Sequence, residues 1–186
     1  MFSTREIKPL IFDEYPYKKY MVKCAQPPQL KFLCFDEYEF RIYKGEGTVQ
    51  FVAYYPFAFS VISPDLAYSD QGSIVNNNGD LPANLDIIFA LDNIPSTITL
   101  ELRDANKKTI GKMILNNIVS QGDNDTYILI NSQTQLIEGL DSNKKKTGKL
   151  YNRFITSGDF FWPPVGRSYL VSSTKFENAN YTPLYF

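Results

Sequence analysis

The side chains that could carry out catalysis in this chain are limited to carboxylates and lysines, because its 186 residues include no histidine. A missing histidine removes the usual general base near neutral pH and every Ser–His or Cys–His nucleophile pair. The acidic candidates lie in three groups: Asp13 and Glu14; Asp36, Glu37 and Glu39; and Asp123 and Asp125. A glycoside hydrolase would need two carboxylates facing each other across a cleft, about 5 to 9.5 Å apart. We expect these acids to be solvated residues of turns and the protein not to be an enzyme, with a hydrolase kept as the third hypothesis.

Ligands for a metal ion are also sparse. The two cysteines, Cys24 and Cys34, form no C-x-x-C motif, and without histidine a zinc site would need added carboxylates, an uncommon structural set. In a reducing compartment both cysteines are expected to be buried thiols, and a disulfide between them is the alternative. The run Asp123-Asn124-Asp125 resembles the start of a calcium loop but lacks the glycine at the sixth position and the glutamate at the twelfth. We therefore expect neither a metal site nor a cofactor.

The single tryptophan, Trp162, follows two phenylalanines and precedes two prolines in the run FFWPP. An exposed aromatic ring can stack on a sugar, so a carbohydrate-binding module is an alternative function, with Trp162 as the candidate platform. A tryptophan in such a run also packs under a turn, which would make its role structural. Exposure on a concave face would favour the sugar platform, and burial under a turn would favour the structural role.

Charge and hydropathy argue against two classes of partner. The 19 basic and 20 acidic residues give a formal net charge of -1, without the basic bias typical of nucleic-acid-binding surfaces. The sequence contains no run of 18 or more apolar residues, and its first twenty residues lack the apolar core of a secretory signal. We expect the chain to fold in a cytoplasm and to bind neither nucleic acid nor a membrane.

Alternation of apolar and polar residues predicts strands in the first sixty residues. Three segments have this pattern: residues 17–24, 30–35 and 38–42. The run Lys44-Gly45-Glu46-Gly47 then supplies two residues that tolerate positive φ, which predicts a turn. A buried strand is expected over residues 48–55, because they are rich in β-branched and aromatic types. Pro56 has no N–H to donate to a ladder, so this strand should end there.

Residues 60–83 change in character and hold Pro64, Gly72, Gly79 and Pro82 together with a run of asparagines, which predicts a loop and a domain boundary. Beyond it, short strands separated by turn residues are predicted at 85–91, 97–103, 109–115, 126–130, 149–156 and 169–172. Only residues 134–140 carry a signal for a short helix. The pattern predicts an all-β protein with a sandwich or jelly roll in its second part.

Several motifs resemble those of one family. The run KGEGTVQFVAYYPFAFS from Lys44 to Ser60 resembles the strand and aromatic-proline corner that close the N-terminal domain of siphophage distal tail proteins. The run from Gly79 to Ala83 resembles the opening of that family's galectin-like domain, and the run from Ser157 to Gly166 resembles the GDF…P-x-G turn before its last strand. The ending NYTPLYF from Asn180 resembles the closing strand. The order and spacing of these motifs extend the resemblance over most of the chain.

The resemblance implies a shortened ring-forming (belt) β domain over residues 1–62, a linker over 63–83 and a galectin-like sandwich over 84–186. The last strand of the sandwich is a candidate to return to the first domain. Family members carry a longer first domain, which here would be abbreviated, lost in a fragment or supplied by another chain. The implied function is structural: a distal tail component of the tail tip or baseplate hub that links tail tube to adsorption apparatus. The implied partners are identical copies in a ring, a hexamer in this family, together with the tail tube protein and tail tip or receptor-binding proteins. The chain would be made in the host cytoplasm and reside in the virion tail.

Four aromatic residues within six positions form the candidate subunit interface: Tyr54, Tyr55, Phe57 and Phe59. A strand has two faces, and a small domain seldom has room to bury so many rings on both. Tyrosine and phenylalanine are also enriched at interfaces between proteins. The residues expected to shape turns around this and the later motifs are Gly45, Gly47, Pro56, Gly158, Asp159 and Gly166.

Overall fold

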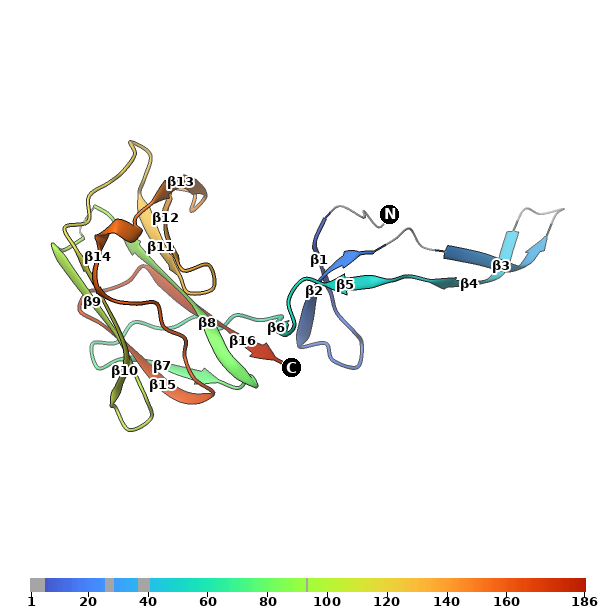
Figure 1. Cartoon of the computed structure of the whole chain (residues 1–186), viewed down its shortest axis with the longest axis horizontal. Coiled ribbons are helices and arrows are strands. Elements are labelled where there is room, and N and C mark those ends of the chain that lie inside the picture. Colours follow the sequence, from blue (N-terminus) through green and yellow to red (C-terminus); the bar gives the residue numbers. More distant parts are fainter. Residues whose placement is uncertain (1–5, 26–28, 37–40, 93) are drawn as a thin grey trace. The chain divides into compact units, whose positions relative to one another are not determined.

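The computed structural model describes the whole chain except residues 1–5, 26–28, 37–40 and 93, and it also leaves undescribed the side chains within 30–46. The chain divides into two compact units, Met1–Val61 and Ile62–Phe186 (Figure 1). Each unit is described by itself below.

The first unit is built around strand β2, which pairs with neighbours on both of its edges. Its small antiparallel sheet contains β1 (Lys8–Leu10), β2 (Lys18–Cys24), β5 (Phe51–Ala53) and β6 (Ala58–Ser60). Strand β1 lies along one edge of β2, while β5 and β6 follow each other along the other edge. Strands β3 (Gln29–Asp36) and β4 (Arg41–Thr48) form a separate antiparallel ribbon. The predicted strands at 17–24 and 30–35 are confirmed as β2 and β3.

The predicted glycine turn is wrong. Gly45 and Gly47 lie inside β4, where they pair with Phe32 and Leu30 of β3. Glycine permits a turn but does not require one, and here the long ladder with β3 holds the segment extended. The predicted strand over residues 38–42 falls partly outside the described residues.

The predicted buried strand over residues 48–55 is also corrected. In that range Thr48 ends β4, and only Phe51–Ala53 forms a further strand, β5, whose burial pattern is half-buried, exposed, exposed. Because β5 pairs only with the end of β2, it has little sheet around it to bury either face. Part of the segment is extended, as predicted, but its residues are half-buried or exposed rather than buried.

The second unit is a sandwich of two antiparallel sheets (Figure 1). One sheet has the order β16 (Asn178–Tyr185), β8 (Leu81–Ala90), β11 (Tyr127–Asn131), β12 (Leu136–Leu140) and β13 (Lys146–Leu150). The other has the order β14 (Ile155–Gly158), β10 (Thr109–Asn116), β9 (Thr97–Arg103), β15 (Gly166–Ser172) and β7 (Ser73–Asn77). A single turn of 3-10 helix, η1 (Asn152–Phe154), precedes β14. The predicted all-β fold is confirmed.

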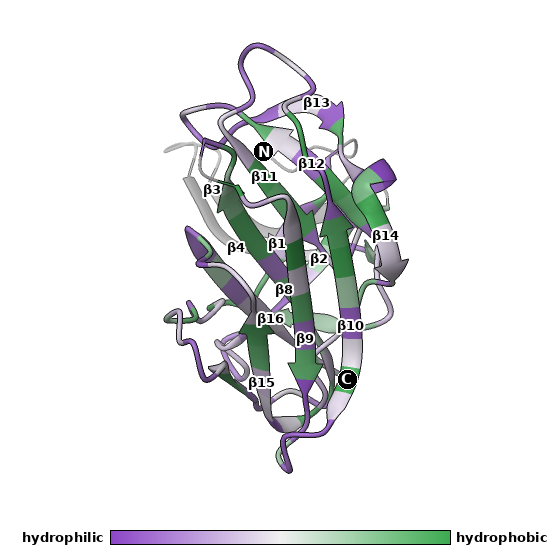
Figure 2. Ribbon diagram, turned by 90° about the vertical axis from the view of Figure 1, so that its left-hand side faces the viewer, coloured by the Kyte–Doolittle hydropathy of each residue, from purple (hydrophilic) through white to green (hydrophobic). Residues whose placement is uncertain are grey.

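The core of the sandwich follows from the alternation along its central strands. In β9 the side chains of Ile98, Leu100 and Leu102 are buried, while Thr99 and Glu101 between them are half-buried. Strand β8 repeats the pattern with Leu85, Ile87 and Phe89, and the inward residues of both sheets form one hydrophobic cluster. In Figure 2 the strands of the sandwich are largely hydrophobic and its loops largely hydrophilic.

Three predictions about the second unit are corrected. The predicted linker over residues 63–83 contains β7, which pairs with β15, and the first residues of β8. The short helix predicted over residues 134–140 is instead a turn followed by β12. In that turn the side-chain oxygen of Asn131 accepts hydrogen bonds from the backbone N–H and the hydroxyl of Thr134, which favours a hairpin over a helix. The strand predicted at 149–156 is divided among β13, η1 and β14.

Candidate assembly interface

The four predicted interface residues form one stack of rings, which we call the aromatic corner: Tyr54, Tyr55, Phe57 and Phe59. The ring centroids of Tyr55 and Phe57 are 5.6 Å apart and stacked, and Tyr55 meets Phe59 edge-on at 5.2 Å. Tyr54 meets Tyr55 edge-on at 4.9 Å, and Phe57 meets Phe59 at 5.3 Å. Pro56 lies in the bend between β5 and β6 that brings these rings together. Edge-on and offset contacts at these distances are the favourable arrangements for aromatic pairs.

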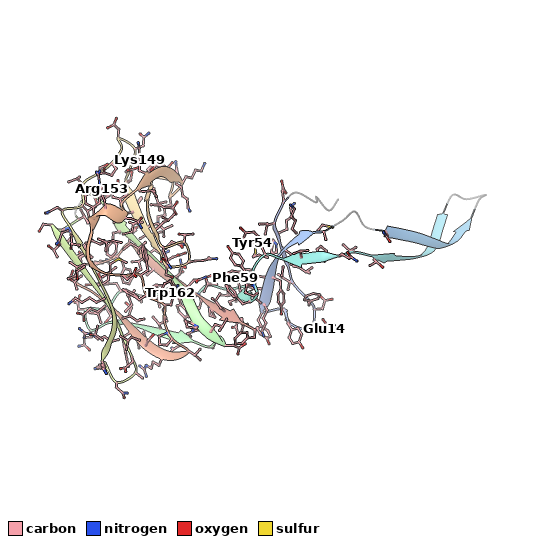
Figure 3. The ribbon with its side chains drawn as sticks, viewed as in Figure 1. Glu14, Tyr54, Phe59, Lys149, Arg153 and Trp162 are labelled. Atoms are coloured by element: carbon pink, nitrogen blue, oxygen red, sulfur yellow. The ribbon has the colours of Figure 1, made fainter. Side chains whose placement is uncertain are left out.

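Exposure rises steeply across the aromatic corner (Figure 3). Phe59 is 6% exposed, Tyr55 and Phe57 are half-buried, and Tyr54 is 62% exposed. The backbone N–H of Tyr54 donates to the carbonyl oxygen of Met21 at 2.8 Å, so the segment that carries the exposed ring is held against β2. The corner therefore presents an ordered tyrosine backed by further rings, a favourable anchor for a partner surface because little side-chain freedom is lost on binding.

A second exposed aromatic group, missed in the sequence, lies in the loop between β1 and β2. We call it the aromatic loop: Ile11, Phe12, Tyr15 and Tyr17, each between 45% and 52% exposed. Phe12 packs edge-on against Tyr20 at 5.9 Å, and the ammonium of Lys18 lies 5.9 Å from the Tyr15 ring and 5.7 Å from the Tyr17 ring. The run IFDEYPY, with apolar residues on both sides of an acidic pair, was the available signal.

The predicted turn residues of the sandwich occupy strand ends. Gly158, with φ of +81°, ends β14, where a Cβ atom would collide with the carbonyl oxygen of Lys112. Asp159 follows, and its side chain accepts the N–H of Phe160 at 2.7 Å. Gly166 begins β15 with φ of +90°, and no atom lies within 4 Å of the place a Cβ would take. Gly158 is thus required by both its backbone angle and a close approach, and Gly166 by its angle alone.

Two of the acidic candidates, Asp123 and Asp125, line one polar pocket together with Asp141. Asp13 and Glu14 are exposed in the aromatic loop. The carboxylate of Asp125 accepts hydrogen bonds from the hydroxyls of Thr147 in β13 and of Tyr151, the residue before η1, each at 2.5 Å. These bonds connect the loop that carries Asp125 to both elements. Burial, followed by the neighbouring Asp125 carboxylate, raises the pKa of Tyr151. These two hydrogen bonds give Asp125 a structural role, whereas the side chain of Asp36 and the residues Glu37 and Glu39 lie outside the described part of the chain.

A polar pocket of about 870 Å³ lies beside Asp125, between the loops of residues 121–126 and 141–149, with Lys149 on its wall (Figure 3). Trp162 does not line this pocket. Its side chain is 37% exposed, between the buried Phe161 and Pro163. Trp162 is therefore exposed rather than buried under the turn.

Cys24 is buried in β2, and the side chain of Cys34 lies outside the described residues. Within the described residues, no helix has the length and apolar character needed to cross a membrane.

Comparison with known proteins gives one informative result. No protein-family model and no curated protein sequence matches the chain. Among solved structures, the chain is similar to the crystal structure of the Dit protein of SPP1, described as a paradigm of the hub adsorption apparatus in phages that infect Gram-positive bacteria. The TM-score is 0.64 and the identity 13%, over 100% of this chain and 67% of the other. At this identity the likeness shows the fold: the chain has an all-β, Dit-like fold across its full length.

Proposed function

We propose that this protein is a structural component of a bacteriophage tail, the distal tail protein that joins the tail tube to the adsorption apparatus. The observation that carries the proposal is the fold likeness to a phage hub protein, which covers both units of the chain rather than the sandwich alone. The motifs quoted from the sequence point to the same family.

The proposed mechanism is assembly. Identical copies would form a ring, six in the family that the sequence resembles, and the ring would bind the tube protein on one side and tip or receptor-binding proteins on the other. The aromatic corner supports this mechanism, because Tyr54 is exposed on an ordered stack of rings. Residues 1–61 would supply the ring-forming part and the sandwich would supply a rigid outer part.

The proposal is tested on the purified full chain and on the virus. Size-exclusion chromatography with light scattering is expected to give six times the mass of one chain, and electron microscopy is expected to show closed rings. Gold-labelled antibody against the chain should mark the distal end of the tail in particles of the phage or prophage that encodes it. Label on the head or along the tail tube would contradict the proposed role.

A further inference from the structure

The small sheet of the first unit has two different faces, which follow from the register of β2. Successive residues of a strand point to opposite faces, and directly paired residues of neighbouring strands share a face. Tyr20 and Val22 therefore point to one face of β2, and Lys19 and Lys23 to the other.

The aromatic loop lies on the Tyr20 face, because the Phe12 ring packs against Tyr20. Its tip carries two exposed carboxylates, Asp13 and Glu14. The nearby Lys18 lies over the Tyr15 and Tyr17 rings. We call this side the loop face: apolar rings around an acidic tip.

The aromatic corner lies on the opposite side, because Phe59 pairs with Lys19 and its ring belongs to the stack that ends at Tyr54. Val52 pairs with Lys23 and shares the same face, where it is 58% exposed. Figure 3 shows Glu14 and Tyr54 on opposite sides of β2. We call this side the corner face: apolar side chains beside two lysines.

We propose that the loop face of one copy docks on the corner face of the next, so that Asp13 and Glu14 meet Lys19 and Lys23 of the neighbouring copy. This inference rests on the proposed ring and names its two surfaces. A closed ring is built from head-to-tail contacts, in which each copy contributes two different patches. The acidic tip of the loop face and the two lysines of the corner face are complementary in charge, and both faces expose apolar rings or side chains, as such a contact requires.

Charge reversal tests the pairing of the two faces. The loop variant Asp13→Lys/Glu14→Lys and the face variant Lys19→Glu/Lys23→Glu each place like charges at every contact. Each should need at least about tenfold more protein than wild type for half-maximal assembly in light scattering, because like-charge juxtaposition across an interface is strongly unfavourable. The chain carrying all four substitutions should assemble as wild type does. An equimolar mixture of the two variants should do so too, because opposite charges meet at every contact when the two variants alternate around the ring.

A matched control reverses two exposed lysines of the sandwich, Lys145→Glu/Lys175→Glu, and should assemble normally. Circular dichroism and melting temperature of every variant establish that it is folded. If wild type assembles but the loop and face variants assemble equally well, or if the fourfold variant is not restored, the pairing is overturned while the ring stands. If the face variant is impaired but the loop variant assembles normally, the acidic tip is not part of the contact, and the pairing is overturned in this case as well. A wild-type chain that stays monomeric at all concentrations would overturn both the ring and the pairing.

Discussion

Tyr54 and Phe59 belong to one stack of rings, yet solvent reaches them very differently. Burial decides how much a side chain contributes to the free energy of folding. Removing a buried side chain loses the free energy of its transfer out of water and leaves a cavity, whereas removing an exposed one does neither. The exposed end of the stack is instead available to a partner. Within this cluster Phe59 is placed to contribute to stability, while Tyr54 is placed to make the contact that we propose with a partner.

Phe59→Ala is expected to lower the free energy of unfolding by about 3 kcal/mol, the usual range for a buried phenylalanine. Tyr54→Ala removes an exposed ring and should change this free energy by about 0.5 kcal/mol or less. Urea denaturation followed by circular dichroism measures both. Equal losses for the two variants would mean that the exposure gradient across the aromatic corner is wrong.

Gly158 and Gly166 provide a second matched pair, since both have positive φ but only Gly158 has a backbone carbonyl in the place of a Cβ. Gly166→Ala should cost about 1–2 kcal/mol for the backbone angle. Gly158→Ala should cost clearly more, because β14 must move away from β10. Thermal unfolding of the two variants would show it, and a smaller loss at Gly158 would contradict the close approach.

At the scale of elements, the outward faces of the sandwich strands carry charges in contrasting surroundings. Asp86 of β8 is partly buried, and desolvation raises its pKa, although Lys146 and a hydrogen bond from Asn131 oppose the shift. Glu101 of β9 has the opposite shift: the hydrogen bond from Arg103, assisted by Lys112, lowers its pKa.

Asp86→Asn is therefore expected to raise the melting temperature at pH 7. A carboxyl whose pKa is raised on folding favours the folded state when protonated, so wild type loses stability relative to the variant as pH rises above the unfolded pKa of about 3.9. The gain of the variant should vanish at pH 3. Glu101→Gln is the control of opposite sign: it should lower the melting temperature at pH 7 and leave it unchanged at the lowest pH. If both variants changed the melting temperature in the same direction at pH 7, the opposite pKa shifts of Asp86 and Glu101 would be contradicted.

Strands were predicted from the sequence where the alternation of apolar and polar residues within the strand agrees with its pairing to distant strands. Strands β9 and β10 were found because alternating apolar residues give each one buried face. Strand β7 was missed because Val75 is its one buried apolar residue, and its pairing with β15, almost a hundred residues later, leaves no local trace. The turn at Gly45 and Gly47 was wrongly predicted for the same reason, since only the ladder with β3 decides that they stay extended.

The interface candidates show the same limit. Aromatic density located the corner, because four rings in six residues exceed what a thin sheet can bury. The aromatic loop was missed because its apolar residues are interrupted by Asp13, Glu14 and Pro16, so no periodic pattern marks them. That Glu14 and Tyr54 lie on opposite faces depends on the register of β2, which requires the paired strands on each side.

At the scale of the whole molecule, the division after Val61 predicts where a protease cuts. Ile62 is exposed, while Asp65 bridges to Asn180 and the N–H of Leu66 donates to Ala179, so the sandwich holds the chain from Asp65 onward. Limited proteolysis followed by mass spectrometry is expected to yield a stable fragment that begins near Ile62. A fragment beginning near Leu81 would mean that β7 is dispensable, and first cleavage within residues 85–130 would contradict the two-unit organisation.

The place of β16 has a consequence for the timing of synthesis. Its residues Ala179 and Tyr181 belong to the hydrophobic cluster of the sandwich, and the strand pairs with β8, about a hundred residues earlier in the chain. A ribosome that has made β8 must therefore complete nearly the whole second unit before β8 gains this neighbour and the cluster is filled. Until then the growing chain exposes the core side of β8 and an open sheet edge, both prone to association with other chains. The sandwich is thus expected to close only once β16 has been made, and assembly with other copies would begin from chains that already carry this strand.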